Sequence, residues 1–161
     1  MRWLVDGYNV IRRDAEFRDA ETRSLEAGRT ALLTLVTQLA RETGEVFVVV
    51  FDGARRTGGG PAGAHVEIVF SRPPETADDV LRRLAITYRE GAVVVTSDRA
   101  VLDAARRAGA VGVEADAFLD AARREGRHEG DDELDQPPQR GRKPSREARA
   151  TARVLRRLAE R

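Results

Sequence analysis

The sequence predicts an α/β protein in which a parallel sheet carries helices on both faces. Three observations predict this class. Apolar, β-branched runs recur along the chain, as at Val46–Phe51 and Ala92–Thr96. These runs are apolar throughout instead of alternating with polar residues, which is typical of strands that are covered on both faces. Segments with helical periodicity separate the runs, and this alternation of strand and helix is typical of parallel sheets.

The elements follow one another in a regular order. Strands are predicted at Arg2–Asp6, Val46–Phe51, His65–Phe70, Ala92–Thr96 and Val111–Glu114. Helices are predicted at 24–42, 76–89, 97–108, 116–124 and, after a gap, 145–161. The helix at 24–42 has apolar residues at spacings of three and four, and Gly44 is expected to end it. The Asp-Gly pairs at Asp6 and Asp52 are common turn pairs, so each also fits a simple turn after its strand.

The composition excludes several kinds of chemistry. The 161 residues, 41% of them hydrophobic, suffice for one domain with a real core. The absence of cysteine excludes disulfide scaffolds, Cys-ligated zinc, iron–sulfur clusters and thiol catalysis. His65 and His128 lie far apart in the sequence, which argues against a multi-histidine metal site or a Ser-His-Asp triad. With no apolar run of membrane-spanning length and no signal peptide, we expect a cytoplasmic protein.

The charge is divided along the chain. The net charge is +1 overall, but residues 136–161 carry nine basic and two acidic side chains. Residues 125–144 have no periodicity and contain several prolines, so they predict a flexible linker between a domain at 1–124 and a basic helix at 145–161. Such a linker would let the helix move relative to the domain. The arginines of this helix share one face, whereas Val154, Leu155 and Leu158 lie on another. The helix therefore either binds a polyanion, packs back on the domain, or only adds solubility.

Aspartates gather where the predicted strands end. Asp6 and Asp52 close two strands, Asp98 follows a third, and Asp78 and Asp79 open the helix after another. The carboxyl ends of parallel strands meet at one edge of a sheet, and neighbouring strands are about 5 Å apart. Crowded carboxylates repel one another unless a cation neutralises them, and all-oxygen ligands suit Mg²⁺ or Mn²⁺. Because such an ion can activate water and clamp a phosphodiester, the pattern predicts metal-dependent hydrolysis of nucleic acid.

Each of these acids also has a structural interpretation. Thr76 and Asp79 fit a Thr-x-x-Asp variant of the capping box, and Asp98 suits the start of a helix. Tyr8 could stack on a base, but a packed tyrosine is the commoner case. No Gly-x-Gly-x-x-Gly turn follows the first strand, which argues against dinucleotide binding.

Four motifs in order carry a family resemblance: DGYNVI at 6–11, VVFDG at 49–53, ETADD at 75–79 and VTSDR at 95–99. Over about residues 1–122 this combination resembles the YacP-like NYN family of PIN-like nucleases. The resemblance implies a PIN-like sheet of strand order 3-2-1-4-5. It also implies a divalent-metal-dependent endoribonuclease that uses Mg²⁺ or Mn²⁺, with messenger RNA decay or the ribosome as its setting.

The resemblance also implies roles for individual residues. Asp6, Asp78 and Asp98 would hold the metal, and Asn9 would orient the site or contact the scissile phosphate. Asp52, Asp79, Thr96 and Ser97 would support them. Contacts with single-stranded RNA are expected from Arg99 and, because of the basic charge of the tail and not because of the resemblance, from Arg146, Arg149, Arg153, Arg156 and Arg157. The alternative is a non-catalytic RNA-binding module with the same fold, and the oligomeric state stays open.

Overall fold

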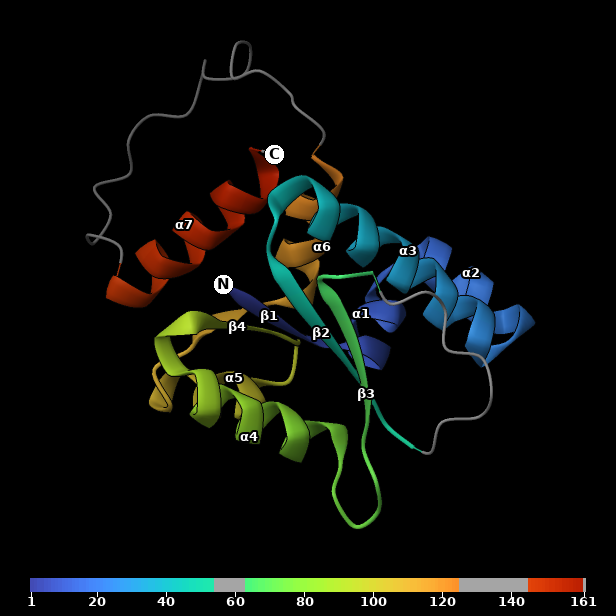
Figure 1. Cartoon of the computed structure of the whole chain (residues 1–161), viewed down its shortest axis with the longest axis horizontal. Coiled ribbons are helices and arrows are strands. Elements are labelled where there is room, and N and C mark those ends of the chain that lie inside the picture. Colours follow the sequence, from blue (N-terminus) through green and yellow to red (C-terminus); the bar gives the residue numbers. More distant parts are fainter. Residues whose placement is uncertain (54–62, 125–144, 161) are drawn as a thin grey trace.

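A five-stranded parallel sheet forms the centre of the computed structural model, which describes residues 1–53, 63–124 and 145–160 (Figure 1). The strands are β1 (Arg2–Asp6), β2 (Val46–Phe51), β3 (Val66–Phe70), β4 (Ala92–Val95) and β5 (Val111–Val113). Their order is β3-β2-β1-β4-β5, which confirms the expected fold class. The central strand β1 pairs in parallel with β2 and with β4, so the carboxyl ends of these strands reach one rim.

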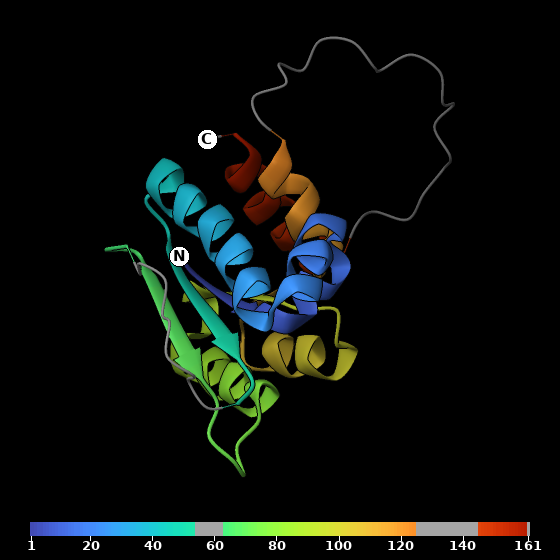
Figure 2. The ribbon, with the colours of Figure 1, turned by 90° about the vertical axis from the view of Figure 1, so that its right-hand side faces the viewer.

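Helices cover both faces of the sheet, as expected. The helices are α1 (Gly7–Arg13), α2 (Ala15–Arg23), α3 (Leu25–Thr43), α4 (Ala77–Tyr88), α5 (Arg99–Arg107), α6 (Ala115–Arg123) and α7 (Arg146–Ala159), with a 3₁₀ turn, η1, at Arg89–Gly91. Helices α4 and α5 lie on one face, and α1, α3, α6 and α7 lie on the other (Figures 1 and 2). The helices expected within 24–124 start and end within two residues of their predicted bounds. Gly44 ends α3 in the left-handed conformation, with φ of 67°.

Alternate side chains of the strands enter two separate cores. Trp3 and Val5 of β1 join the core under α3 and α6, whereas Leu4 joins the core under α4 and α5. Trp3 stacks on Phe47 with ring centres 5.8 Å apart. Burial on both faces explains why the strands are apolar throughout.

The turn expected after Asp6 is wrong. Gly7 begins α1, and Asp6 caps this helix by accepting a hydrogen bond from the Asn9 N–H. Glycine is required at this position because a Cβ atom on Gly7 would lie 2.2 Å from Cε1 of Phe51, and not because of turn geometry. Gly53, after Asp52, does take a φ of 96°, which favours glycine.

The C-terminal helix α7 packs on the domain. Val154 and Leu158 are buried in the same core as Trp3, and the Thr151 hydroxyl donates a hydrogen bond to the carbonyl of Gly112 at 3.1 Å. The expectation of a helix that moves freely is therefore wrong for α7, and of the three alternatives the structure has packing on the domain. The linker predicted at 125–144 lies outside the described residues. None of the helices that the structure describes is both long and apolar enough to cross a membrane.

Candidate active site at the carboxyl ends of the strands

Asp6 lies at the centre of the rim, where β1 ends, and only 9% of it is exposed. The Thr96 hydroxyl donates a hydrogen bond to its Oδ2 at 2.9 Å, and the Asn9 N–H donates to its Oδ1 at 3.3 Å. Burial raises the pKa of Asp6, and the charges of Asp78 and Asp52 raise it further, against the opposing effect of the two hydrogen bonds. Asp6 therefore gains from a cation that stabilises its ionised form.

Asp78 lies in the first turn of α4 and remains accessible, with 37% of its side chain exposed. Burial raises its pKa, and the charge of Asp98 is the next largest cause. Arg82 opposes this shift from 4.0 Å. The name acid rim is used here for the carboxylates of Asp6, Asp52, Asp78 and Asp98, which come from four separate segments. The negative charge of Asp78 repels each of the other three.

Thr96 connects two members of the acid rim. Besides donating to Asp6, its hydroxyl accepts a hydrogen bond from the Asp98 N–H at 3.2 Å. The Oδ1 atom of Asp98 accepts from the N–H groups of Ala100 and Val101, so Asp98 caps α5. The capping interpretation of Asp98 is therefore correct, and its charge still acts on Asp78.

Asn9 and Ser97 lie beside Asp6 and face each other. The Ser97 N–H donates to Oδ1 of Asn9 at 2.8 Å, which fixes the orientation of the amide and leaves its NH₂ group pointing away from that bond. The Ser97 hydroxyl is buried, and no group among the described residues forms a hydrogen bond with it. Buried polar atoms of this kind are normally satisfied, so an orphan at a polar rim indicates a place for water or ligand.

Asp52 serves as a connector within the acid rim. Its Oδ1 accepts hydrogen bonds from the Ser71 hydroxyl at 2.7 Å and from the Ala77 N–H at 2.8 Å. These bonds tie the end of β2 to the residue after β3 and to the start of α4, which carries Asp78. Sequence reasoning gave Ser71 no role, although its position directly after a strand, like that of Asp52, was a usable signal.

Asp79 caps α4. Its Oδ2 accepts from the N–H of Thr76 at 3.0 Å, while the Thr76 hydroxyl accepts from the Asp79 N–H at 3.3 Å. These bonds form the capping box that the sequence allowed, and they lower the pKa of Asp79. The Asp79 carboxylate is thus already hydrogen-bonded at the start of its own helix.

The donors at the rim fit a hard divalent cation in kind, but they do not form a closed cage. Among residues 1–53, 63–124 and 145–160, no three Asp, Glu or His side chains are arranged to hold a metal ion. Mg²⁺ usually keeps several waters and binds through one or two carboxylates together with substrate phosphates. Asp6 and Asp78, whose ionised forms are both destabilised, could bind an ion in this way, with Asp98 beside Asp78.

The expected RNA-binding arginines fall into two places. Arg99 is exposed at the start of α5, next to Asp98. The five arginines of α7 are also exposed, but Arg157 pairs at 2.9 Å with Glu45, directly before β2. The structure therefore places this end of α7 at the amino ends of the strands and not at the acid rim.

Tyr8 packs against the core: its ring meets that of Phe51 edge-on, with centres 5.2 Å apart.

Comparisons with known proteins agree with this architecture. The model of the YacP-like NYN domain family matches residues 3–161, so the match continues through α7, past the expected limit near residue 122. The protein YacP of Bacillus subtilis (strain 168), described as uncharacterized, is 33% identical over 100 residues. That alignment spans 59% of this chain and 59% of the relative's length.

Two solved structures of Rae1 (YacP) from Bacillus subtilis have similar folds. One superposes with a TM-score of 0.66 and 29% identity, covering 76% of this chain and 73% of the other. The second, a mutant form, gives a TM-score of 0.64 and 28% identity, covering 76% of this chain and 74% of the other.

Proposed function

Because the chain belongs to the YacP-like NYN domain family, whose fold is that of PIN-like nucleases, we propose that it is an endoribonuclease dependent on Mg²⁺ or Mn²⁺. One observation carries the proposal: Asp6 and Asp78, which lie on different elements, both have a raised pKa, and each is affected by further rim carboxylates. Such a cluster is stabilised by a cation, and a cation at the carboxyl ends of parallel strands lies where ligands of this fold type bind.

The residues of the rim have distinct tasks in this proposal. Asp6 and Asp78 would hold the cation, with Asp98 beside Asp78 as the third predicted ligand; when bound, the cation would supply positive charge to the scissile phosphate and lower the pKa of water. Thr96 orients Asp6 through its hydrogen bond, and Ser97 orients Asn9. The NH₂ group of Asn9 donates to a phosphate oxygen, and Arg99 neutralises the next phosphate of the strand.

The substrate in this proposal is single-stranded RNA in the cytoplasm. A messenger RNA, free or on a ribosome, is the substrate class that the family resemblance supports. The arginines on the outer face of α7 would contact the phosphates of the same RNA.

A non-catalytic RNA-binding module is the second candidate. The lack of a preformed three-carboxylate cluster among the described residues favours it. A binder of this kind would hold RNA equally well in EDTA.

Cleavage of end-labelled RNA separates the two candidates. An unstructured strand and a hairpin are incubated with Mg²⁺, Mn²⁺ or EDTA, using the unaltered protein, Asp6→Asn and Asp78→Asn. Asp19→Asn, at an exposed position of α2, is the matched control. We expect cleavage only with a cation, preference for the unstructured strand, and loss of about two to three orders of magnitude in kcat in the two rim variants, as for other groups that stabilise charge in a transition state. Binding without cleavage under all conditions would refute the nuclease.

A further inference from the structure

A second polar site lies at the opposite ends of the strands. Here the chain forms an open hollow of about 470 Å³. Tyr88, Arg89, Glu90 and Gly91 line one side of it, and Arg107 and Gly109 line the other. This hollow is separate from the acid rim, because it lies where α4 and α5 end and the rim lies where α4 and α5 begin.

Positive charge dominates the hollow. Arg89 and Arg107 are exposed, and the guanidinium carbon of Arg2 lies 4.5 Å from the centre of the Tyr88 ring. Glu90 is the single acidic residue of the lining. Nearby arginines are neutralised, since Arg83 and Arg106 pair with acidic residues at 3.0 and 3.1 Å. Arg2, Arg89 and Arg107 have no such ion pair within the described part of the chain.

The backbone at Arg89 is strained. Its φ of 46° and ψ of −122° make it the one non-glycine residue with a positive φ among those the structure describes. Such conformations cost free energy and cluster at functional positions. Gly109, with φ of 93°, lies opposite, where an added Cβ would be 3.9 Å from Cβ of Arg89. The two segments therefore approach closely, and the packing around Arg89 holds it in this conformation at the edge of the hollow.

We propose that this hollow binds the sugar–phosphate backbone of single-stranded RNA. Arg89 and Arg107 contact phosphates, for which the planar guanidinium is well suited. The stacked pair of Arg2 and Tyr88 offers a flat surface for a base. The proposal rests on the proposed function in one respect: the RNA held here is the flank of the strand that is cut at the acid rim.

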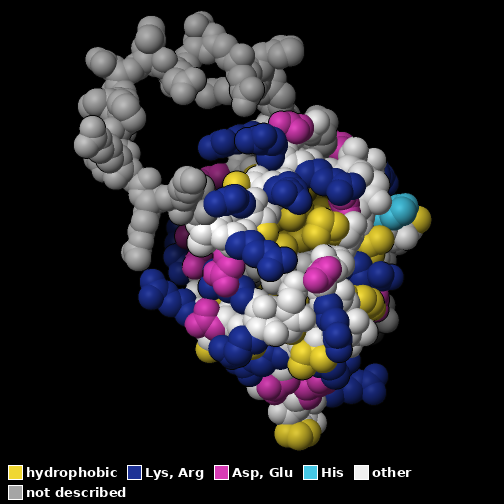
Figure 3. Space-filling view, turned by 90° about the vertical axis from the view of Figure 1, so that its left-hand side faces the viewer, with side chains coloured by type: hydrophobic (Ala, Val, Ile, Leu, Met, Phe, Trp, Pro, Cys, Tyr) yellow, Lys and Arg dark blue, Asp and Glu magenta, His cyan; other side chains and the backbone are white. Residues whose placement is uncertain are grey.

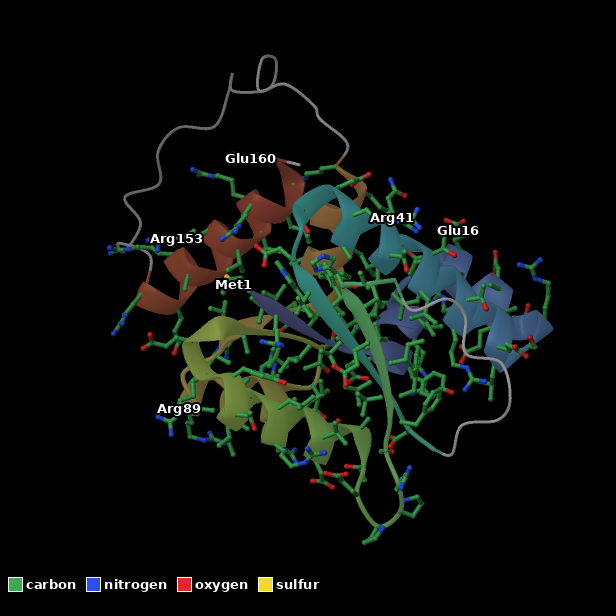
Figure 4. All side chains as sticks on the ribbon, in the orientation of Figure 1. Met1, Glu16, Arg41, Arg89, Arg153 and Glu160 are labelled. Carbon is green, nitrogen blue, oxygen red and sulfur yellow. The ribbon has the colours of Figure 1, made fainter. Side chains whose placement is uncertain are left out.

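The position of the hollow sets how the RNA runs. Arg2 begins β1 and Asp6 ends it, so the two sites are separated by about 13 Å along the strand. Helix α7 begins close to the hollow, because Arg106 of α5 pairs with Glu147 near the start of α7 at 3.9 Å. Arg89 and Arg153 project from the same end of the molecule in Figure 4, and Figure 3 shows Lys and Arg side chains spread over this side.

Binding measured without cleavage tests the hollow. Fluorescence anisotropy of a labelled single-stranded RNA of about 16 nucleotides, the upper end of common site sizes, is recorded in EDTA over a range of salt concentrations. The double variant Arg89→Gln with Arg107→Gln is compared with Arg18→Gln with Arg23→Gln on α2. The control removes the same charge at the far end of the molecule (Figure 1). We expect weaker binding in the first variant only, with its log–log salt slope reduced by about 1.4, or 0.7 for each phosphate contact.

The outcomes separate this proposal from the proposed function. Equal RNA affinity and an equal salt slope in the two double variants would contradict RNA binding in the hollow, even if the unaltered protein cleaves RNA. A selective loss in a protein that cleaves no RNA would support the hollow and refute the nuclease. Polyglutamate that competes with RNA only when Arg89 and Arg107 are present, and binds more tightly than RNA, would overturn RNA in favour of an acidic protein partner.

Discussion

The hydroxyl of Ser71 donates to Oδ1 of Asp52 across 2.7 Å, and this bond orients the carboxylate that binds the start of α4. The same oxygen receives the Ala77 N–H, so one carboxylate oxygen joins two strand ends to the start of the helix. Asp78 is the next residue of that helix. The geometry of the acid rim thus depends on a serine that does not itself belong to it.

Ser71→Ala should lower both stability and cleavage. The Asp52 carboxylate, which is exposed, loses the hydrogen bond from the buried Ser71 hydroxyl, which costs about 1 kcal/mol, and the start of α4 becomes less fixed. Urea unfolding gives the stability, and kcat on a short RNA gives the effect on the site. Thr87→Ala is the control, because its hydroxyl donates to the Arg83 carbonyl on the exposed side of the same helix. Equal changes in kcat in both variants would contradict this role of Ser71.

Asp78 and Asp79 should respond differently to the same substitution. Asp78→Ser should abolish cleavage with little change in Tm, because this carboxylate repels its neighbours and holds the cation. Asp79→Ser should keep most of the activity. It should lower Tm slightly, because the variant loses the carboxylate that accepts from the Thr76 N–H but keeps the backbone N–H that donates to the Thr76 hydroxyl. Parallel loss of activity in the two variants would show that both carboxylates bind the cation.

Asp6→Asn should stabilise the protein at neutral pH when no divalent cation is present. The folded state raises the pKa of Asp6 above 3.8, so it binds the proton more tightly than the unfolded state does. Its contribution therefore destabilises the fold as the pH rises from about 3.8 through the folded pKa. Thermal unfolding in EDTA should give a higher Tm for the variant at pH 7 and a smaller difference as the pH falls towards 3.8. A variant that is less stable at every pH would contradict the electrostatic origin.

Leu158→Ala should destabilise the whole domain. Its side chain is 1% exposed within the main core, and comparable truncations of buried leucine cost about 2–5 kcal/mol. Arg153→Ala on the exposed face is the control, and we expect a change within about 0.5 kcal/mol. Removal of all residues after Asp135 should lower Tm further. If that truncation left Tm unchanged, α7 would not be part of the core.

The sequence predicted the sheet well because burial on both faces leaves a strong pattern. The runs at Val46–Phe51 and Ala92–Val95 are apolar throughout, and the structure places both next to β1. The segment after Asp6 was misread because Asp-Gly is a common turn pair. The glycine at position 7 is explained by the ring of Phe51, 44 residues away in sequence, and no local pattern reveals such a close approach.

The sequence predicted which residues form the acid rim, but it did not predict what each of them does. Asp6, Asp52 and Asp98 each lie at or directly after the end of a parallel strand, and parallel strand ends meet at one edge of the sheet. The sequence pattern therefore sufficed to bring them together. The hydrogen-bond partners of Asp52 lie 19 and 25 residues further along the chain, so its connecting role required coordinates. The packing of α7 was open for a similar reason, since an amphipathic helix fits both a core and a partner.

The burial of Val154 and Leu158 in the same core as Trp3 has a consequence for how the chain folds during synthesis. Contacts between residues so distant in sequence form late, because the chain between them must first lose conformational entropy. Strand β1 precedes its sheet neighbours β2 and β4 in the chain but lies at the centre of the sheet, so its contacts are completed only when β2, β4 and finally α7 have been made. Until residue 158 has emerged, the apolar surface around Trp3 stays incomplete and exposed, and a nascent chain that stalls before that point is prone to aggregation.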